Sequence, residues 1–203
     1  MSLASQPQLS PQEYLALERQ AARKHEYYGG GVFAMAGASP NHNRVVRKVL
    51  TQLDGQLRGG NCEVFHSDLR LYCPIGLMTY PDVQVICGPA VHYDDQHDTV
   101  TNPRLIVEVL SKSTERYDRG QKFEFYRSVP SLAEYVLISY REPRIERFIR
   151  QPQGWLLIET SGLAATMELT AIGATLALAE AFRDVDFPPR PPTIVRSDDE
   201  ELE

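Results

Sequence analysis

Alternating hydrophobic and polar positions along the chain predict a mixture of helices and strands. Ser or Thr residues that cap a following segment predict three helices, at about 11–22, 40–58 and 114–128. The second helix has the clearest pattern, because Val45, Val49 and Leu53 recur at helical spacing while Arg and Lys occupy the opposite face. Segments typical of strands lie at about 62–66, 68–73, 80–87, 104–110, 134–139, 144–150 and 155–159. Three successive glycines also predict a hairpin over about 26–35.

Helices and strands interleaved in this order predict an α/β fold class. We expect a mixed β-sheet flanked by helices, with an added antiparallel β section toward the C-terminal end. A single domain should cover 1–187, because no repeat or low-complexity stretch interrupts it. Residues 188–203 have four prolines in the first five positions and five acidic residues in the last six, a composition typical of a disordered acidic tail.

The composition limits the classes of protein and partner. With 203 residues, 42% of them hydrophobic and 24% charged, the chain can fold around its own core. Because the net charge is −6, a nucleic acid would have to bind at a local basic patch. No apolar run is long enough to span a bilayer, and the first residues do not form a signal peptide. We therefore expect no membrane partner and a cytoplasmic location.

The cysteines predict no cross-link. Cys62, Cys73 and Cys87 are odd in number, and none of them forms a C-x-x-C motif, so the sequence indicates neither a disulfide framework nor a cysteine zinc site. This pattern agrees with a reducing compartment.

Glu108 is the most informative single residue for chemistry. It interrupts an otherwise apolar strand, in which Leu105, Val107 and Val109 share one face while Ile106 and Leu110 share the face of Glu108. A carboxylate in this position would be buried, so it must be protonated, ion-paired or bound to a metal. A structural ion pair with an arginine and a functional site are both open interpretations.

Two further residues could act together with Glu108. Asp82 follows Pro81 at the start of the segment 80–87, and it would lie within a few ångströms of Glu108 if that strand pairs with the one at 104–110. A shared proton or a divalent cation would then relieve the repulsion between the two carboxylates. The alternative is that Asp82 only caps a turn. Lys122, on the helix after the Glu108 strand, could reach the pair.

His42 and Asp68 are candidates for supporting roles. His42 lies in the first turn of the second helix, in register with the apolar face, so we expect it to point toward the core. A satisfied structural histidine is the alternative to a catalytic one. Asp68 is open to the same two interpretations.

The order of these features resembles the PD-(D/E)XK nuclease superfamily and, within it, the Uma-two family of restriction endonuclease-like proteins. The resemblance covers about 8–187. It is carried by Met35–Ser39 with His42, Cys62–Phe65, Pro81–Val83, Val107–Ser111, Ser113–Thr114, Asp118–Arg119 and Lys122–Tyr126. The simple E-x-K pattern would place lysine at position 110, where this chain has leucine. Lys122 on the next helix occupies the place to which related families relocate that lysine.

The resemblance implies a restriction-endonuclease-like core and a divalent-metal-dependent endonuclease that hydrolyses phosphodiester bonds in DNA. Asp82, Glu108 and Lys122 would be the catalytic residues. Asp82 and Glu108 would hold Mg²⁺, or Mn²⁺ in its place, with the Val109 carbonyl as an additional ligand. Lys122 would position the attacking water and stabilise the charge that develops. Glu26 is the candidate for a further acidic residue that the family often has near the hairpin turn.

The resemblance also implies a homodimer, whose two sites would act on the two strands of a DNA substrate. Candidates for contacts to the DNA backbone are Arg44, Arg47, Lys48, Arg116 and Arg119. The alternative function is a catalytically inactive module of the same fold that binds nucleic acid or a protein partner, and a nuclease for RNA or branched DNA is a third possibility. Metal binding through Asp82 and Glu108 distinguishes the enzyme from the inactive module.

Overall fold

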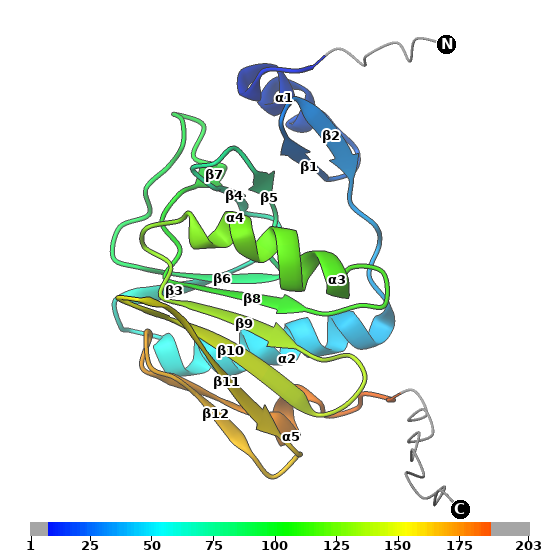
Figure 1. Ribbon diagram of the computed structural model, residues 1–203, viewed down its shortest axis with the longest axis vertical. Helices are drawn as coiled ribbons and strands as arrows, with labels where there is room; N and C mark the ends of the chain where they lie inside the picture. The colour runs from blue at the N-terminus through cyan, green and yellow to red at the C-terminus, as the bar shows by residue number, and fades with distance from the viewer. Residues whose placement is uncertain (1–7, 188–203) are drawn as a thin grey trace, which may run out of the picture.

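A six-stranded sheet forms the centre of the molecule (Figure 1). The structure is a computed structural model, and it describes residues 8–187. The strand order across the sheet is β11-β10-β9-β8-β6-β3. These strands are β3 (Cys62–His66), β6 (Val83–Cys87), β8 (Leu105–Val109), β9 (Glu134–Ile138), β10 (Arg144–Gln151) and β11 (Gly154–Ser161). Because β8 and β9 run parallel while the other neighbours are antiparallel, the sheet is mixed, as predicted.

Helices cover both faces of this sheet (Figure 1). The central strand β8 is buried throughout, and its apolar side chains on each face pack against one of these helices. On one face, Leu105 and Val107 pack with the apolar side of α2 (Pro40–Leu57). On the other face, Ile106 packs with α4 (Phe123–Arg127). Full burial of each such side chain stabilises the fold by about 1.5–3 kcal/mol. The prediction that this strand is buried on both faces is confirmed.

A second, smaller sheet lies at the end of the molecule that holds the first helix (Figure 1). Its strand order is β2-β1-β5-β4-β7. The elements of this part are α1 (Pro11–Glu18), β1 (His25–Tyr28), β2 (Gly31–Ala34), β4 (Arg70–Tyr72), β5 (Met78–Thr79) and β7 (Thr99–Val100). The β1–β2 hairpin turns at Gly29 and Gly30, which both have positive φ, so the glycines there serve the turn as predicted.

The chain between β8 and β9 forms a helical segment with an irregular middle turn. The short helix α3 (Glu115–Tyr117) continues into the π-helical turn η1 (Asp118–Lys122), which continues into α4. The sequence predicts the extent of this segment but not the π turn. Such turns are rare in proteins, but those that occur are often found at functional sites. This one carries two buried charged residues, Asp118 and Lys122.

The C-terminal part adds elements that the sequence pattern does not resolve. The strands β12 (Thr166–Leu169) and β13 (Ala174–Ala177) form an antiparallel hairpin, and the short helix α5 (Leu178–Ala181) follows. The antiparallel meander of β9, β10 and β11 is as predicted. In the N-terminal half, the first helix ends at Glu18 rather than near position 22.

Two further predictions concern the C-terminal tail and membrane-spanning helices. The predicted acidic tail, 188–203, lies outside the described residues. Within the described range, no helix combines the length and the apolar character that a membrane crossing requires.

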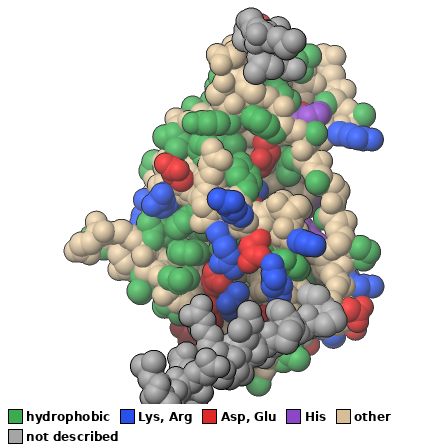
Figure 2. Space-filling model, turned by 45° about the vertical axis from the view of Figure 1, so that its right-hand side comes forward, with side chains coloured by type: hydrophobic (Ala, Val, Ile, Leu, Met, Phe, Trp, Pro, Cys, Tyr) green, Lys and Arg blue, Asp and Glu red, His purple; other side chains and the backbone are tan. Residues whose placement is uncertain are grey.

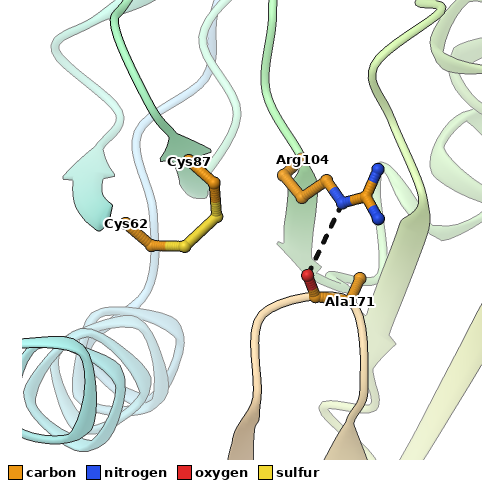
Figure 3. The surroundings of a disulfide bond; sticks show 4 residues. All are labelled: Cys62, Cys87, Arg104 and Ala171. Atoms are coloured by element: carbon orange, nitrogen blue, oxygen red, sulfur yellow. Dashed lines mark hydrogen bonds between the residues drawn. A yellow bond between two sulfur atoms is a disulfide. The ribbon is translucent and has the colours of Figure 1, made fainter. Parts of the chain in front are cut away.

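A disulfide joins Cys62 and Cys87, so the expectation of no cross-link is wrong (Figure 3). β3 and β6 are antiparallel neighbours, and their register places these two residues directly opposite each other. Counting cysteines does not reveal such a pair, because strand pairing brings together residues 25 positions apart. The inference of a reducing compartment loses the support that it drew from the cysteines.

Figure 3 also shows that the side chain of Arg104 donates a hydrogen bond of 3.5 Å to the carbonyl oxygen of Ala171, in the β12–β13 turn.

A buried ion pair connects the central sheet to the β12–β13 hairpin. Nη1 of Arg147 in β10 lies 3.4 Å from Oε1 of Glu134 in β9, and both side chains are buried. The same carboxylate oxygen accepts hydrogen bonds from the Thr170 hydroxyl at 2.8 Å and from the Ala171 N–H at 3.1 Å. Glu134 therefore depends on donors from two parts of the chain.

Replacing Arg147 with methionine should lower the free energy of unfolding by about 3–5 kcal/mol, because the change leaves the Glu134 carboxylate buried without a counter-charge. Urea unfolding measures this loss. Arg58→Met is the control, since Arg58 forms an exposed pair with Asp54 whose loss should change stability by less than about 1 kcal/mol. Equal effects of the two changes would contradict the assignment.

Candidate active site

A cavity of about 1530 Å³ opens at the carboxyl end of β8. Its walls include the end of the chain before β1 with Glu26 of β1, the segment between β2 and α2, the first turn of α2, Asp82 before β6, the chain from Glu108 to Lys122, and residues 185–187. Six ionisable side chains in these walls are largely buried: Glu26, His42, Asp82, Glu108, Asp118 and Lys122. The fold therefore gathers residues that are widely separated in the sequence into one cluster.

Asp82 and Glu108 meet because β6 pairs with β8. The register places Val83 opposite Val107, so Asp82, one residue before β6, lies beside Glu108. The Asp82 N–H donates a hydrogen bond of 3.4 Å to Oε2 of Glu108, and the Val109 N–H donates one of 2.8 Å to Oδ2 of Asp82. The prediction that Asp82 lies within a few ångströms of Glu108 is confirmed.

Lys122 places its ammonium group among three carboxylates. Its Nζ lies 2.9 Å from Oε1 of Glu108 and 3.6 Å from both Oδ1 of Asp118 and Oε1 of Glu26. The π turn η1 presents Asp118 and Lys122 to the same side, toward β8. Lys122 therefore reaches Glu108, one member of the predicted pair, and Glu26 of the β1 hairpin also contacts its ammonium group.

Hydroxyl groups complete the cluster, and sequence reasoning missed them. The Tyr126 hydroxyl donates a hydrogen bond of 2.6 Å to Oε1 of Glu108. The Tyr117 hydroxyl donates one of 3.1 Å to Oε2 of Glu26, and the Thr79 hydroxyl donates to the other oxygen of that carboxylate. A signal for Tyr126 was present, since it follows Lys122 by four positions and so lies on the same side of the helix.

His42 lies inside the cluster and Asp68 lies outside it. Nε2 of His42 is 3.1 Å from Oδ2 of Asp82, so His42 points inward as expected. Asp68 is 66% exposed and pairs with Lys24 and His66 instead, and it is not among the cavity residues. A supporting role for Asp68 stays a prediction.

The basic residues proposed for DNA contact do not line this cavity. Lys48 is buried and pairs with Asp184, while Arg119 pairs with Glu115 and Glu146. Arg44 donates a hydrogen bond to the side chain of Asn41. The expected partners of the DNA backbone are thus engaged within the protein itself in these three cases.

Negative charge exceeds positive charge in the cluster. Four carboxyl groups, those of Glu26, Asp82, Glu108 and Asp118, surround the basic groups of Lys122 and His42. Burial raises the pKa of Glu108 to about 8; Lys122 opposes the shift, while Asp82 and Asp118 reinforce it. Burial also raises the pKa of Asp118, against the pull of Lys122. Glu108 therefore holds its proton to a higher pH than an exposed glutamate does.

The two basic groups favour their charged forms. Burial alone would lower the pKa of Lys122, but the neighbouring carboxylates outweigh burial and raise this pKa well above its ordinary value. Burial would likewise lower the pKa of His42, and the interaction with Asp82 outweighs it, so the pKa of His42 is also raised.

The donor set fits Mg²⁺, the metal that the family resemblance implies. Within residues 8–187, no group of three or more His, Cys, Asp or Glu side chains is arranged to hold a metal ion. Asp82 and Glu108 nevertheless offer two hard carboxylates where negative charge is in excess. Mg²⁺ in proteins commonly uses one or two carboxylates and completes its shell with waters and substrate phosphates. Lys122 and Tyr126 bind Oε1 of Glu108, so Oε2 is the more available ligand atom.

The raised pKa of Glu108 predicts a specific pH dependence of folding stability in the absence of divalent cations. The protonated form is favoured in the folded state, so its contribution is fully present below the ordinary value of 4.5 and is lost as the pH rises through about 8. Glu108→Gln cannot titrate, so its melting temperature should fall less than that of the wild type over this interval. Thermal unfolding in EDTA at a series of pH values measures the difference. Parallel curves for the two proteins would contradict the assigned shift.

Comparisons with known proteins identify the family and the fold. A family model, Uma2, described as "Putative restriction endonuclease", matches residues 11–179. Two uncharacterized proteins of Synechocystis sp. (strain ATCC 27184 / PCC 6803 / Kazusa) are similar over most of their length. The protein slr1290 is 38% identical over 183 residues, which is 89% of this chain and 95% of that protein. The protein sll1609 is 39% identical over 172 residues, which is 84% of this chain and 97% of that protein.

A solved structure shows the same fold. The crystal structure of "a putative nuclease belonging to DUF820" from Anabaena variabilis ATCC 29413 matches with a TM-score of 0.68 at 13% identity, over 84% of this chain and 96% of that chain. This likeness and the mixed sheet with flanking helices are consistent with the restriction-endonuclease-like fold that the sequence predicts. With a family model that covers most of its length, the chain belongs to the Uma2 family.

Proposed function

We propose that this protein is a divalent-metal-dependent endonuclease that hydrolyses phosphodiester bonds in DNA, with Mg²⁺ as the cation and Mn²⁺ as a substitute. One observation carries the proposal: Asp82, Glu108 and Lys122 converge at the end of a cavity from separate elements, with the Lys122 ammonium group and the Asp82 N–H both in contact with the Glu108 carboxylate. Membership of the Uma2 family supports the reaction class.

The proposed reaction adds water to phosphorus, breaks one P–O ester bond and leaves a phosphate monoester and an alcohol. A cation held by Asp82 and Glu108 would polarise the phosphate and lower the pKa of a bound water. The order of the family motifs favours this arrangement over one in which Glu108 serves only as a structural ion-pair partner of Lys122. Oε2 of Glu108, which neither Lys122 nor Tyr126 contacts, favours it as well.

Lys122 supplies a fixed positive charge where negative charge develops. The neighbouring carboxylates keep its ammonium group protonated and oriented, so this charge need not reorganise during the reaction. We assign to it the positioning of the attacking water and the stabilisation of the charge on the pentacoordinate phosphorus. Glu26 is a positioning residue, because its contacts are with Lys122 and with hydroxyl groups of the protein.

His42 holds Asp82 rather than the substrate. Its Nε2 and the Val109 N–H both approach the same oxygen of Asp82, Oδ2, which fixes the orientation of that carboxylate. Tyr126 fixes Glu108 in the same way, through Oε1. These contacts keep both proposed metal ligands in place before a cation binds.

The proposal includes a homodimer, because two sites related by a two-fold axis would act on both strands of a duplex. Sedimentation velocity of the full chain tests this part separately from catalysis. A cytoplasmic location also stays a prediction.

Asp82→Asn should reduce nicking of supercoiled plasmid in Mg²⁺ or Mn²⁺ by about a hundredfold or more, because it removes one negative charge from the proposed metal site. The change keeps the size of the side chain and an oxygen that can accept the Val109 hydrogen bond. Gel electrophoresis over time measures the rate. Asp54→Asn, an exposed carboxylate near the far end of α2, is the matched control and should nick at the wild-type rate.

EDTA should abolish nicking by the wild type. A wild type that fails to nick plasmid, single-stranded and branched DNA with either cation would favour the inactive binding module. Lys122→Ala is less suitable as a test, because it leaves Glu108 and Asp118 buried without their counter-charge and should itself destabilise the fold.

Mg²⁺ or Mn²⁺ should also raise the melting temperature of the wild type, because a ligand that binds only the folded state stabilises it. The gain is about 2.7 kcal/mol when the cation concentration is a hundred times the Kd. Differential scanning fluorimetry measures the shift. Glu108→Gln should respond much less than the wild type and Asp54→Asn should respond fully. An equal response of all three proteins would place the bound cation elsewhere.

A further inference from the structure

The cavity carries a second set of charges nearer its mouth. Arg23, Lys24 and Lys112 belong to its lining, and Arg23 and Lys112 are exposed. Neither of these two forms an ion pair with a carboxylate of residues 8–187. Lys24 differs, because it pairs with Asp68 and donates a hydrogen bond of 2.8 Å to the Ser67 carbonyl oxygen. Arg23 and Lys112 are thus the basic side chains of this lining that remain available to a ligand.

The sign of the charge therefore changes with depth. Buried carboxylates dominate the bottom of the cavity, and at the mouth lie two exposed cations without an ion-pair partner among residues 8–187. A cation alone would find the bottom attractive and the mouth repulsive, whereas a polyanion alone would find the reverse. A polyanion that brings a divalent cation between itself and the carboxylates satisfies both parts at once. A nucleic acid strand with its phosphates is a ligand of this kind.

Chain spacing keeps both cations close to the carboxylates. Lys112 follows Glu108 by four residues and Arg23 precedes Glu26 by three, so their Cα atoms are at most about 14 Å and about 11 Å from those of the acidic residues. Phosphates of one DNA strand succeed each other by about 3.4 Å along the helix axis. A phosphate bound at the bottom therefore has neighbours within reach of these long side chains.

The loop that carries Lys112 is ordered by its own hydroxyl groups. Oγ of Ser111 lies 3.1 Å from Oγ of Ser113 and 2.9 Å from Oγ1 of Thr114, and it accepts a hydrogen bond of 3.2 Å from the Thr114 N–H. This loop begins directly after β8, which holds Glu108. The position of Lys112 is thus coupled to that of the proposed metal ligand. Because the loop is already ordered, binding pays a smaller entropic cost to fix it.

We propose that Arg23 and Lys112 bind the phosphates that flank the scissile phosphate, and so set the path of the DNA strand across the cavity. This inference rests on the proposed nuclease function and names the side chains that position its substrate. It replaces the helix-based residues that the sequence suggested for this role. Figure 2 shows one face of the molecule on which Lys and Arg side chains gather with acidic side chains among them, although the chain as a whole has a net charge of −6.

The test uses Arg23→Ala and Lys112→Ala in the full chain, with binding separated from chemistry. Fluorescence anisotropy of a short labelled duplex, with Ca²⁺ in place of Mg²⁺ and the duplex checked for integrity on a gel, gives Kd over a range of salt concentrations. Each change should weaken binding by roughly threefold to tenfold and reduce the slope of log Kd against log salt concentration by about one. Lys112→Glu should weaken binding further than Lys112→Ala.

Arg58→Ala is the matched control, because Arg58 is an exposed arginine on α2 that pairs with Asp54 and does not line this cavity. Its Kd and salt slope should equal those of the wild type. Melting temperatures of the Arg23 and Lys112 variants should also be unchanged, as should the Mn²⁺-induced rise in melting temperature, since neither side chain forms an ion pair within the described part of the chain or lies at the proposed metal site.

The outcomes separate this inference from the function on which it rests. If the wild type nicks plasmid and binds the duplex while both variants keep its affinity and salt slope, the strand follows another path and the inference is wrong. If the variants lose affinity and slope while Arg58→Ala does not, the inference holds. A wild type that neither nicks nor binds DNA would overturn both.

Discussion

The ammonium group of Lys122 is the interaction on which the arrangement of this site depends. It lies 2.9 Å from one buried carboxylate and 3.6 Å from two others, which belong to β1, β8 and the π turn η1. Removing one partner from such a buried cluster costs about 3–5 kcal/mol, because the remaining charges stay desolvated. The ammonium group thus contacts the β1 hairpin, the central sheet and the helical segment at one point. The π turn fits this constraint, since it carries both Asp118 and Lys122 to the interior.

The same cluster has more acidic than basic groups, and this excess of negative charge is what the proposed metal-dependent chemistry would use. Four carboxyl groups face two basic groups, and burial beside the other carboxylates raises the pKa of Glu108 to about 8. A divalent cation could take the place of the Glu108 proton and satisfy the remaining oxygens. A fully neutral cluster, in which every carboxylate had its own basic partner, would offer a cation no such gain. Incomplete pairing at a buried site therefore favours a binding site over a structural ion pair.

Strand β8 couples this site to the hydrophobic core. Its residues pack alternately against α2 on one face and α4 on the other, and Glu108 occupies one position in that alternation. Because the strand cannot shift by one residue without turning Glu108 toward the wrong face, the core fixes the register of the proposed metal ligand. Pairing with β6 then brings Asp82 beside it, and the loop that follows β8 carries Lys112 to the mouth of the cavity.

The sequence by itself determined the features that depend on local periodicity. The alternation around Glu108 predicted a strand buried on both faces, the motif Pro81–Asp82 marked the start of its partner, and helical spacing placed Lys122 after it. Only the tertiary structure decided which distant residues join them. Glu26 reaches Thr79 across 53 positions, and Cys62 reaches Cys87 across 25. The sequence also suggested Asp68 and the helix-borne arginines, yet these do not line the cavity, while Arg23 and Lys112 do. The physical reason is that periodicity reports which side of an element is buried, whereas the register between strands and the path of loops decide what each buried side meets.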